Sequence, residues 1–358
     1  MSHMTAKIGR SQLRIAILLS GFVFVLGGIT YVGIQLVETG PTEVQNPSEI
    51  SSCKAIHEPG RYELTADIKD SSTNKCIRIM SSDVVLNGNG HSIDGTGAFG
   101  TGGVLVGSFE AQTSNVTVRN VNVTDWDDGI RYIHVTNGTV ANTVTENNRV
   151  GLTLLSSNQT TVLNNTATEN AVYGISLQET SHSNMVTNNT AASNALFGIH
   201  LVRSGVRNNT IVSNAALNNE YGIVLIGANT NAVVNNDATA NRIAGIWLSE
   251  ADDNRLSNNT VSNRFYGIYL GDQSNRNLLS TNTATRNAVG IRLLHSDGNA
   301  VTGNTVTDSG VQGILLIASN DTIVTDNRLS NNSAAIVLIR SKNSTRSNDL
   351  NEKPITPR

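Results

Sequence analysis

The sequence predicts an all-β protein in which short strands stack turn upon turn as a single-stranded parallel β-helix. Three observations predict this fold. A Gly-Ile or Gly-Leu pair recurs nine times along the 358 residues, at intervals of 22 to 24. Asparagine occurs 46 times and returns at fixed places within the same repeat. After each repeated glycine, apolar residues alternate with variable ones, which is the pattern of a strand with one buried face.

The composition excludes several classes of protein. Hydrophobic residues make up 38% of the chain, which is too many for a disordered protein. There are 31 glycines but only 5 prolines, which excludes collagen. Charged residues make up 15%, and the net charge of −3 argues against a basic face that binds nucleic acid. We therefore expect no nucleic-acid partner.

The N-terminal 37 residues predict a membrane anchor. Residues 1–14 carry Lys7, Arg10 and Arg14, and the 23 residues of the segment 15–37 carry no charge. As a transmembrane helix this segment would reach about 35 Å, enough to cross a hydrocarbon layer of about 30 Å. The basic flank places residues 1–14 in the cytoplasm and the remaining chain outside. We therefore expect a single-pass cell-membrane protein with its β-helix on the extracellular side.

A cleaved secretory signal is the alternative for the same segment. Signal peptides have apolar regions of about 7–15 residues and end in a small-residue cleavage site. The run over residues 15–37 is longer, and the Gln-Leu-Val-Glu at its end offers no such site. We favour the uncleaved anchor, followed by a linker over residues 38–52.

The only two cysteines, Cys53 and Cys76, come directly after this linker. An even pair in an exported segment favours one disulfide over two free buried thiols. Closing a loop of this length stabilises a fold by about 3 kcal/mol in the chain-entropy model. The bond would hold the first turn of the β-helix, where an end strand otherwise frays.

The repeat covers most of the remaining chain. Its glycines are Gly129, Gly151, Gly174, Gly198, Gly222, Gly245, Gly267, Gly290 and Gly313. A second phrase, approximately N-x-V-x-x-N-x-A-x-x-N, lies between them. Leucine-rich repeats need a different phrase, and propeller blades need about 40 residues. Three short strands fit a repeat of about 23 residues. We expect residues 53–345 to form about 11–12 turns, which stack into a rod of about 55 Å. Residues 346–358 should form a tail.

Stacked turns explain the asparagines. Each side chain lies over its equivalent about 4.8 Å away, so a charged residue would meet its own copy. An asparagine can donate to the turn on one side and accept from the turn on the other, which forms a ladder. The residue before the glycine is Tyr173, Phe197 and Tyr221 in three successive turns, which predicts an aromatic stack. We also expect the repeated glycines to permit tight corners.

These residues resemble a known group. The Gly-Ile-x-Leu and Asn-Asn-Thr phrases look like the right-handed parallel β-helix repeats of NosD-like proteins, of the CASH (carbohydrate-binding and sugar hydrolase) type. The segment from Cys53 to Gly95, with its phrase Val-Val-Leu-Asn-Gly-Asn-Gly-His, is similar to the first coils of exported archaeal members. The resemblance implies a right-handed helix over residues 53–345. It implies no single function, because the group includes lyases, hydrolases, a copper-enzyme maturation factor and many surface proteins.

A polysaccharide lyase or hydrolase is one alternative function. Hydrolysis needs paired carboxylates at one glycosidic bond. The densest acidic segment supplies the weak catalytic candidates Asp125, Asp127, Asp128 and Arg131. The Asn-Thr-Asp, Gly-His-Gly and Arg-Ile-Lys phrases of pectin hydrolases are absent, and Asp128 occupies the position that holds Tyr173 in a later turn. We therefore lean toward a protein that is not an enzyme.

Copper-enzyme maturation is a second alternative, which the NosD resemblance implies. Copper sites in proteins cluster His, Met or Cys. No His-x-His or Met-rich phrase accompanies the exported histidines, which are His57, His91, His134, His182, His200 and His295. Calcium stays open, although no G-G-x-G-x-D repeat supports it. We expect no cofactor and no metal site.

The favoured function is a structural, adhesive or carbohydrate-binding role at the cell surface. Six residues from three successive turns form the candidate ligand site: Trp247, Tyr269, Arg292, Glu250, Asp272 and His295. The first three stand two positions after the repeated glycine, where side chains should face outward, and the others stand five positions after it. Aromatic faces beside carboxylates suit sugar stacking and hydroxyl recognition. Ordinary surface variation is the alternative, because only three turns are involved.

The chain also carries acceptor triplets for N-glycosylation, which an exported location makes accessible. Several arise from the Asn-Asn-Thr repeat itself, so their number overstates the signal. The acceptor residues are Asn115, Asn122, Asn137, Asn158, Asn164, Asn188, Asn208, Asn258, Asn320, Asn331 and Asn343.

The two ends of the β-helix differ in sequence. An uncovered end is a template for strand pairing with another chain. The segment around Cys53 and Cys76 should cap one end, whereas residues 341–358 look like a poor cap. End-to-end self-association is therefore a further hypothesis.

Overall fold

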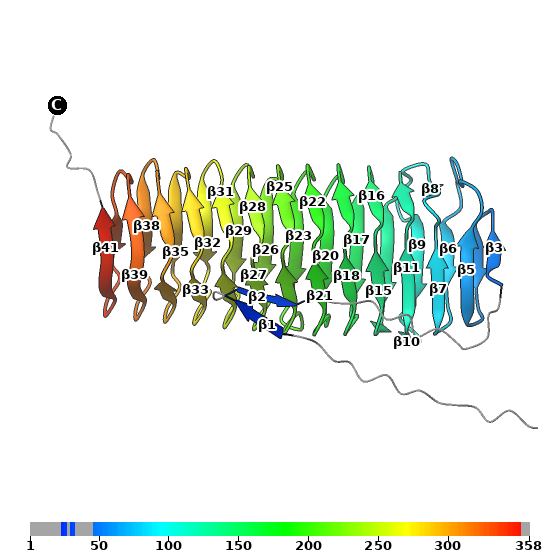
Figure 1. The fold of residues 1–358 in the computed structure, drawn as a ribbon, viewed down its shortest axis with the longest axis horizontal. Coiled ribbons are helices and arrows are strands. Elements are labelled where there is room, and N and C mark those ends of the chain that lie inside the picture. Colours follow the sequence, from blue (N-terminus) through cyan, green and yellow to red (C-terminus); the bar gives the residue numbers. More distant parts are fainter. Residues whose placement is uncertain (1–22, 27–28, 33–45, 352–358) are drawn as a thin grey trace, which may run out of the picture. The chain divides into compact units, whose positions relative to one another are not determined.

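A computed structural model of the chain describes residues 23–26, 29–32 and 46–351. Residues 46–351 form a right-handed parallel β-solenoid with about 23 residues per turn (Figure 1). Most turns contribute three short strands, as the repeat length predicts, whereas the first two turns contribute two each. The prediction of an all-β parallel solenoid is therefore confirmed.

One strand of each turn belongs to a 13-stranded parallel sheet. In order, its members are β4 (Lys54–Ile56), β6 (Lys75–Ile79), β9 (Gly102–Gly107), β13 (Asp128–Ile133), β17 (Val150–Leu155), β20 (Tyr173–Gln178), β23 (Phe197–Val202), β26 (Tyr221–Ile226), β29 (Ala244–Ser249), β32 (Tyr266–Gly271), β35 (Val289–Leu294), β38 (Gln312–Ile317) and β40 (Ile336–Ile339). The repeated Gly-Ile pairs lie at the start of these strands.

The other two strands of each turn belong to a 24-stranded sheet with two columns. The first column is β3 (Ser48–Ile50), β5 (Gly60–Leu64), β7 (Val84–Asn87), β11 (Val116–Arg119), β15 (Thr139–Ala141), β18 (Thr161–Leu163), β21 (Met185–Thr187), β24 (Thr210–Val212), β27 (Ala232–Val234), β30 (Arg255–Ser257), β33 (Leu278–Ser280), β36 (Ala300–Thr302), β39 (Ile323–Ser330) and β41 (Thr345–Asn351). The second column is β8 (Ser92–Asp94), β12 (Asn122–Thr124), β16 (Val144–Glu146), β19 (Thr166–Thr168), β22 (Thr190–Ala192), β25 (Ala215–Leu217), β28 (Asp237–Thr239), β31 (Thr260–Ser262), β34 (Thr283–Thr285) and β37 (Thr305–Thr307). The long strand β39 pairs with both β36 and β37 and so joins the two columns. Two short strands, β10 (Thr113–Ser114) and β14 (Val135–Thr136), pair separately.

The solenoid has about 13 turns, which corrects the expected 11–12. The expectation depended on the Gly-Ile phrase, which the first three strands of the 13-stranded sheet lack. Strand β3 begins at Ser48, within the predicted linker, and β41 runs to Asn351, within the predicted tail. Thirteen strands at about 4.8 Å extend over about 60 Å.

The predicted anchor at residues 15–37 lies mostly outside the described residues. Within it, the structure describes β1 (Val23–Leu26) and β2 (Ile29–Val32), which pair antiparallel. The described part of the chain contains no helix of the length and apolarity needed to span a bilayer. The anchor therefore stays a prediction.

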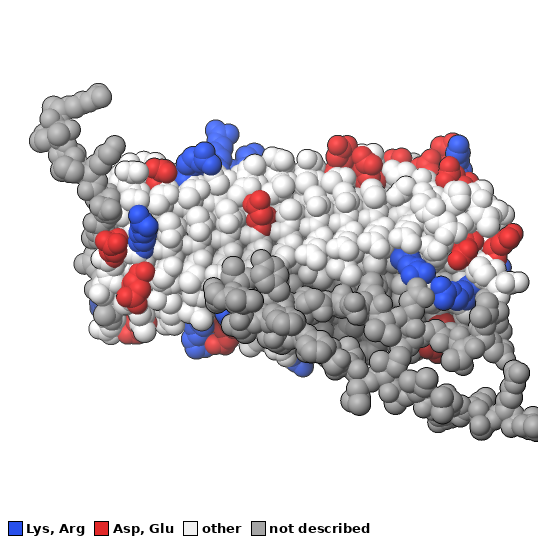
Figure 2. Space-filling view, viewed as in Figure 1, with Lys and Arg blue, Asp and Glu red and all other residues white. Residues whose placement is uncertain are grey.

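The interior of the solenoid is apolar and repeats from turn to turn. In β20 and β23, Ile175 pairs with Ile199 and Leu177 with Leu201, and all four side chains are fully buried. The uncovered part of the face in Figure 2 carries few charged side chains, and most of these lie near its edges. This distribution agrees with the expectation that few charges stack on their own copies.

Asparagine ladders form at all three corners, as predicted. One comprises Asn184, Asn209, Asn231, Asn254, Asn277 and Asn299. A second comprises Asn165, Asn189, Asn214, Asn236, Asn259, Asn282, Asn304, Asn327 and Asn348. The third comprises Asn148, Asn170, Asn194, Asn219, Asn241, Asn263 and Asn287.

Asn189 shows how one ladder residue is satisfied. Its backbone N–H and its Nδ2 both donate to Oδ1 of Asn214 at 2.9 Å. Its Nδ2 also donates to the carbonyl of Val162 at 2.9 Å, in the preceding turn. Its Oδ1 accepts from the backbone N–H and the Nδ2 of Asn165, each at 2.9 Å. The amide of Asn189 therefore bonds to the turns on both sides.

The Asn-Asn pairs divide two tasks between them. The first asparagine adopts the left-handed conformation, with φ of 55° at Asn164 and 54° at Asn188, and it is exposed. Asparagine tolerates this conformation better than most residues. The second asparagine, such as Asn165 or Asn189, is buried in the ladder. Corners therefore bend at exposed residues that are mostly not glycine.

The repeated glycines have a different role from the one expected. None of the nine, all of which lie in the described solenoid, has a positive φ. A Cβ on Gly174 would lie 2.7 Å from Nδ2 of Asn194 and 2.8 Å from the carbonyl oxygen of Gly198. Glycine is required here because the ladder amide and the next turn come too close for a side chain.

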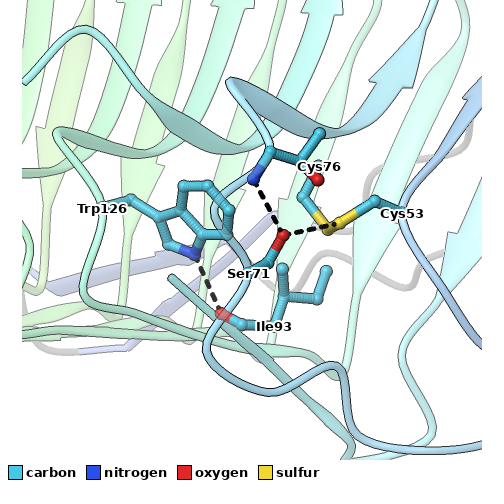
Figure 3. The surroundings of a disulfide bond; sticks show 6 residues. Cys53, Ser71, Cys76, Ile93 and Trp126 are labelled. Carbon is cyan, nitrogen blue, oxygen red and sulfur yellow. Dashed lines mark hydrogen bonds between the residues drawn. A yellow bond between two sulfur atoms is a disulfide. The ribbon is translucent and has the colours of Figure 1, made fainter. Parts of the chain in front are cut away.

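The disulfide between Cys53 and Cys76 is present, as predicted (Figure 3). Cys53 directly precedes β4 and Cys76 lies in β6, so the bond joins the first two strands of the 13-stranded sheet. The hydroxyl of Ser71 lies 3.2 Å from Sγ of Cys53. Nearby, the indole of Trp126 is buried and donates to the carbonyl of Ile93 at 3.1 Å.

We predict that Asn189→Ala lowers the free energy of unfolding by about 3 kcal/mol, because it leaves buried groups of two neighbouring turns without partners. The measurement is urea denaturation followed by circular dichroism. The matched control is Asn188→Gly, which keeps the left-handed corner and removes an exposed side chain. Equal destabilisation by both variants would contradict a special role of the ladder.

We predict that a Cys53→Ser, Cys76→Ser double variant is less stable to urea by about 3 kcal/mol. Reducing agent should destabilise the unmodified protein by a similar amount and leave the double variant unchanged. A protein whose stability is insensitive to both changes would show that the bond does not hold the first turns.

Candidate functional site

A continuous row of aromatic rings covers the outer face of the 13-stranded sheet from β20 to β32. We call this row the aromatic strip. It consists of Tyr173, Phe197, Tyr221, Trp247, Tyr266 and Tyr269. Each strand from β20 to β32 contributes at least one ring.

The rings of the strip are in contact along its length. Tyr173 stacks on Phe197 at 5.4 Å between centroids, and Phe197 meets Tyr221 edge-on at 5.5 Å. Tyr221 stacks on Trp247 at 5.0 Å, and Trp247 lies parallel to Tyr269 at 6.5 Å with an interplanar angle of 8°. Distances and orientations of this kind are favourable for aromatic pairs.

Two positions on each strand supply these rings. The residue before the glycine supplies Tyr173, Phe197 and Tyr221, as the sequence predicts. In β29 this position is Ala244, which leaves room for the ring of Trp247 from the position two after the glycine. The strip therefore passes from one position to the other at β29.

Arg292 extends the strip beyond the last ring. It pairs in register with Tyr269, as predicted from the spacing. Its guanidinium lies 5.0 Å from the ring of Tyr269 and 5.2 Å from that of Tyr266, and its Nη1 donates to the Tyr266 hydroxyl at 2.7 Å. Burial raises the pKa of Tyr269, partly offset by Arg292, so this phenol stays neutral near pH 7.

Sequence reasoning did not include Tyr266 in the candidate site. It stands before Gly267, in register with Ala244 and Val289, so it occupies the same position as Tyr173 and Tyr221. Following the residue before each repeated glycine past Ala244 to β32 would have found Tyr266.

The preceding strands differ from the expectation for outward positions. His200 and Val224 stand two after the glycine, yet their side chains are 4% and 0% exposed. The rings of Tyr173 and Phe197 lie 4.7 and 4.8 Å from the His200 ring and cover it. Burial lowers the pKa of His200 to about 4, so it is neutral at physiological pH.

The carboxylate column predicted beside Trp247 and Tyr269 is also present. Glu250, Asp272 and His295 are exposed and line one groove of about 570 Å³. Asp252, Gln273 and Asn275 complete its lining. We call this the acidic groove. It follows the carboxyl ends of β29, β32 and β35, directly beyond the strip.

The four weak catalytic candidates do not converge on one point. Asp127 and Asp128 are buried and form ion pairs, Asp127 with Arg149 and Asp128 with Arg131 at 2.9 Å. Asp125 lies on an exposed corner with φ of 59°. Asp128 is in register with Val150 of the next turn, and Val150 with Tyr173, as the spacing indicates. This arrangement fits a structural role.

The described residues do not fit a copper site. Copper is bound by clustered His, Met or Cys. Over residues 46–351, no three His, Cys, Asp or Glu side chains lie close enough together to hold a metal ion. The two cysteines form the disulfide, and His200 is buried among aromatic rings.

The predicted glycosylation acceptors all lie at the surface. Eight of these asparagines are exposed, and Asn122, Asn158 and Asn320 are partly exposed. Asn164 and Asn188 stand on neighbouring turns, next to the paired residues Leu163 and Thr187. Occupancy of these sites stays a prediction.

Comparison with known families gives two matches. The model for the right-handed β-helix region matches residues 102–261. The model for the periplasmic copper-binding protein NosD matches residues 237–353. No curated protein matches the sequence. Neither family match bears on an archaeal origin.

Solved structures share the fold. The Dettilon tailspike protein gp208 aligns with a TM-score of 0.61 at 16% identity, over 81% of this chain and 60% of that one. The A-module of the mannuronan C-5 epimerase AlgE6 of Azotobacter vinelandii aligns with a TM-score of 0.54 at 14% identity, over 87% and 90%. The solenoid and the two family matches together identify the chain as a right-handed β-helix repeat protein of the NosD-like type.

Proposed function

We propose that this protein is a non-catalytic β-helix that binds glycans on the aromatic strip. The observation that carries the proposal is the arrangement of Tyr221, Trp247 and Tyr269 as successive near-parallel rings. The apolar face of a sugar ring can stack on such rings while its hydroxyls stay free to bond. Trp247 and Tyr269 are both partly exposed, so a ligand can reach them.

The acidic groove supports the same proposal. Carboxylates accept hydrogen bonds from sugar hydroxyls, and Gln273 and Asn275 can both donate and accept. Its volume of about 570 Å³ is within the usual range for small-ligand sites. The groove and the strip adjoin on the same turns, so one ligand can contact both.

Unsatisfied polar atoms on the strip also favour a ligand surface. Within the described residues, Nε2 of His200, Nε1 of Trp247 and Nε of Arg292 are buried without a hydrogen-bond partner. Buried polar groups are normally paired, because an unpaired one costs about 1–3 kcal/mol. These three unpartnered atoms therefore lower the stability of the solenoid on the face that carries the strip.

A polysaccharide lyase or hydrolase is the alternative, and the ion pairs of Asp127 and Asp128 do not favour it. The binding experiment below therefore includes mass spectrometry of each bound glycan after incubation. Detection of shortened glycans would show that the protein cleaves its ligand, and would contradict a non-catalytic function.

We predict that Trp247→Ala weakens glycan binding by about tenfold or more, because an aromatic side chain that the ligand covers dominates such a contact. A glycan-array screen of the full-length protein identifies the ligand, with and without calcium. Affinity is then measured by isothermal titration calorimetry, because Trp247→Ala removes one of the 2 tryptophans of the chain and leaves no fluorescent tryptophan on the strip.

The matched control for this experiment is Phe99→Ala. Phe99 is 89% exposed and lies outside the strip. Its loss should leave glycan binding unchanged. Absence of any glycan ligand, or equal binding by Trp247→Ala and the unmodified protein, would refute the proposal.

We further propose display outside the cell, on a membrane anchor formed by residues 15–37. The disulfide supports export, because such bonds persist in oxidising compartments. Surface display would also make the exposed acceptor asparagines available for glycosylation.

End-to-end association is a second proposal, and it concerns the C-terminal turn. Within the described residues, β40 pairs only with β38 and β41 only with β39. Their outer edges are therefore templates for strand addition. We predict that the detergent-solubilised chain forms higher-mass species with rising concentration, as measured by light scattering.

The edge variant Ile336→Pro should abolish these species. The carbonyls of Ala335 and Ile339 accept from Ile314 and Ala318, so the N–H of the alternate residue Ile336 points to the free edge, and proline removes this donor. A circular dichroism spectrum checks that the solenoid remains folded. Strictly monomeric protein at all concentrations would contradict the association.

A further inference from the structure

Three arginines gather at the corner that leads into the aromatic strip. Arg242 and Arg264 each follow a ladder asparagine, and Arg286 precedes the ladder asparagine of the next turn. All three are exposed and line one shallow groove of about 580 Å³. We call this the arginine groove. It also includes the amide of Asn218 and the hydroxyl of Ser262.

This gathering is unusual for the solenoid. Neighbouring turns place equivalent residues about 4.8 Å apart, so like charges on successive turns repel. Only 15% of the chain is charged, yet three consecutive turns each contribute a guanidinium to this groove. The cost of such repulsion is offset when an anion occupies the groove.

The protein's own carboxylates neutralise only part of this charge. Arg242 donates to Glu220 at 2.6 Å. The guanidinium of Arg264 lies 5.3 Å from the ring of Phe265. Among the described residues, no carboxylate forms an ion pair with Arg264 or Arg286. By contrast, Arg276 on another corner is paired with both Asp252 and Asp253.

The arginine groove adjoins the aromatic strip directly. Arg242 and Arg264 lie two residues before Ala244 and Tyr266, the first residues of β29 and β32. The acidic groove follows the last residues of the same strands. Six-residue strands are about 20 Å long. A ligand along them would therefore meet arginines first, then aromatic rings, then carboxylates.

We infer that the arginine groove binds an acidic group of a glycan whose sugar rings lie on the aromatic strip. The group is a carboxylate or a sulfate, which guanidinium binds through charge-assisted hydrogen bonds. Exposed Phe265, next to Arg264, supplies an apolar contact at the edge of the groove. This inference rests on the proposed glycan binding and names the ligand class, an acidic polysaccharide with a fixed direction across the face.

The experiment compares three hexasaccharides on the full-length protein by fluorescence titration at low and high salt. They are oligogalacturonate, its carboxyl-reduced neutral form and a heparin-derived sulfated hexamer. We expect an acidic hexamer to bind about tenfold more tightly than the neutral form at low salt, with the difference falling as salt rises. The double variant Arg264→Gln, Arg286→Gln should remove this difference and leave neutral binding unchanged.

The matched control is the double variant Arg255→Gln, Arg328→Gln. It makes the same charge change at exposed positions on β30 and β39 of the 24-stranded sheet. It should preserve the preference for an acidic hexamer. If this control also loses the preference for an acidic hexamer, the preference depends on the overall charge of the protein, and the inference is overturned.

The remaining outcomes separate this inference from the proposed function. Equal affinity for acidic and neutral hexamers overturns the inference and leaves glycan binding in place. An acidic preference that survives in Arg264→Gln, Arg286→Gln overturns it too. If no hexamer binds and the array finds no glycan, both fail. Tighter binding of oligogalacturonate would identify the bound group as a carboxylate, and tighter binding of the heparin-derived hexamer would identify it as a sulfate.

Discussion

The structure depends on one constraint: each side chain must tolerate its own copy one turn away. Asparagine meets this constraint best at a buried corner, because its amide donates and accepts at once. The bonds of Asn189 to Asn165 and Asn214 repeat along a ladder at every corner. The same constraint requires glycine beside the third ladder and limits charge, so composition, fold and stability have a common cause.

Periodicity made most of the fold predictable, because equivalent residues recur every 22 to 24 positions and pair in register. The number of turns was not predictable, since the first three strands of the 13-stranded sheet lack the Gly-Ile phrase. Trp247, Tyr269 and Arg292 were found because they share one position in successive turns. Tyr266 was missed because its neighbours in the column, Ala244 and Val289, are not aromatic. The arginine groove was missed because its residues precede or follow the ladder asparagine in different turns.

Side chains on the outer face are solvated, so they can differ from turn to turn more than the side chains of the interior. In this chain they differ most over a few neighbouring turns. Over β29 and β32, cationic, aromatic and anionic groups succeed one another along the strand direction. Each group comes from a different part of the turn: the corner before the strand, the strand itself and the corner after it. The turns of β29 and β32 each supply one group of every kind, and stacking these two turns extends each group into a short row. This explains why a regular scaffold can carry a site that the repeat does not encode.

The two ends of the solenoid differ in how they are closed. The first two turns are joined by a covalent bond, whereas the last turn is held by hydrogen bonds and packing alone. A one-dimensional stack loses turns from its weaker end, because each turn contacts only its neighbours. Unwinding should therefore advance from β40 toward β4. Strands β38 and β40 lie between Arg292 and that end. The C-terminal turns can therefore unfold before the strands that carry the aromatic strip are affected.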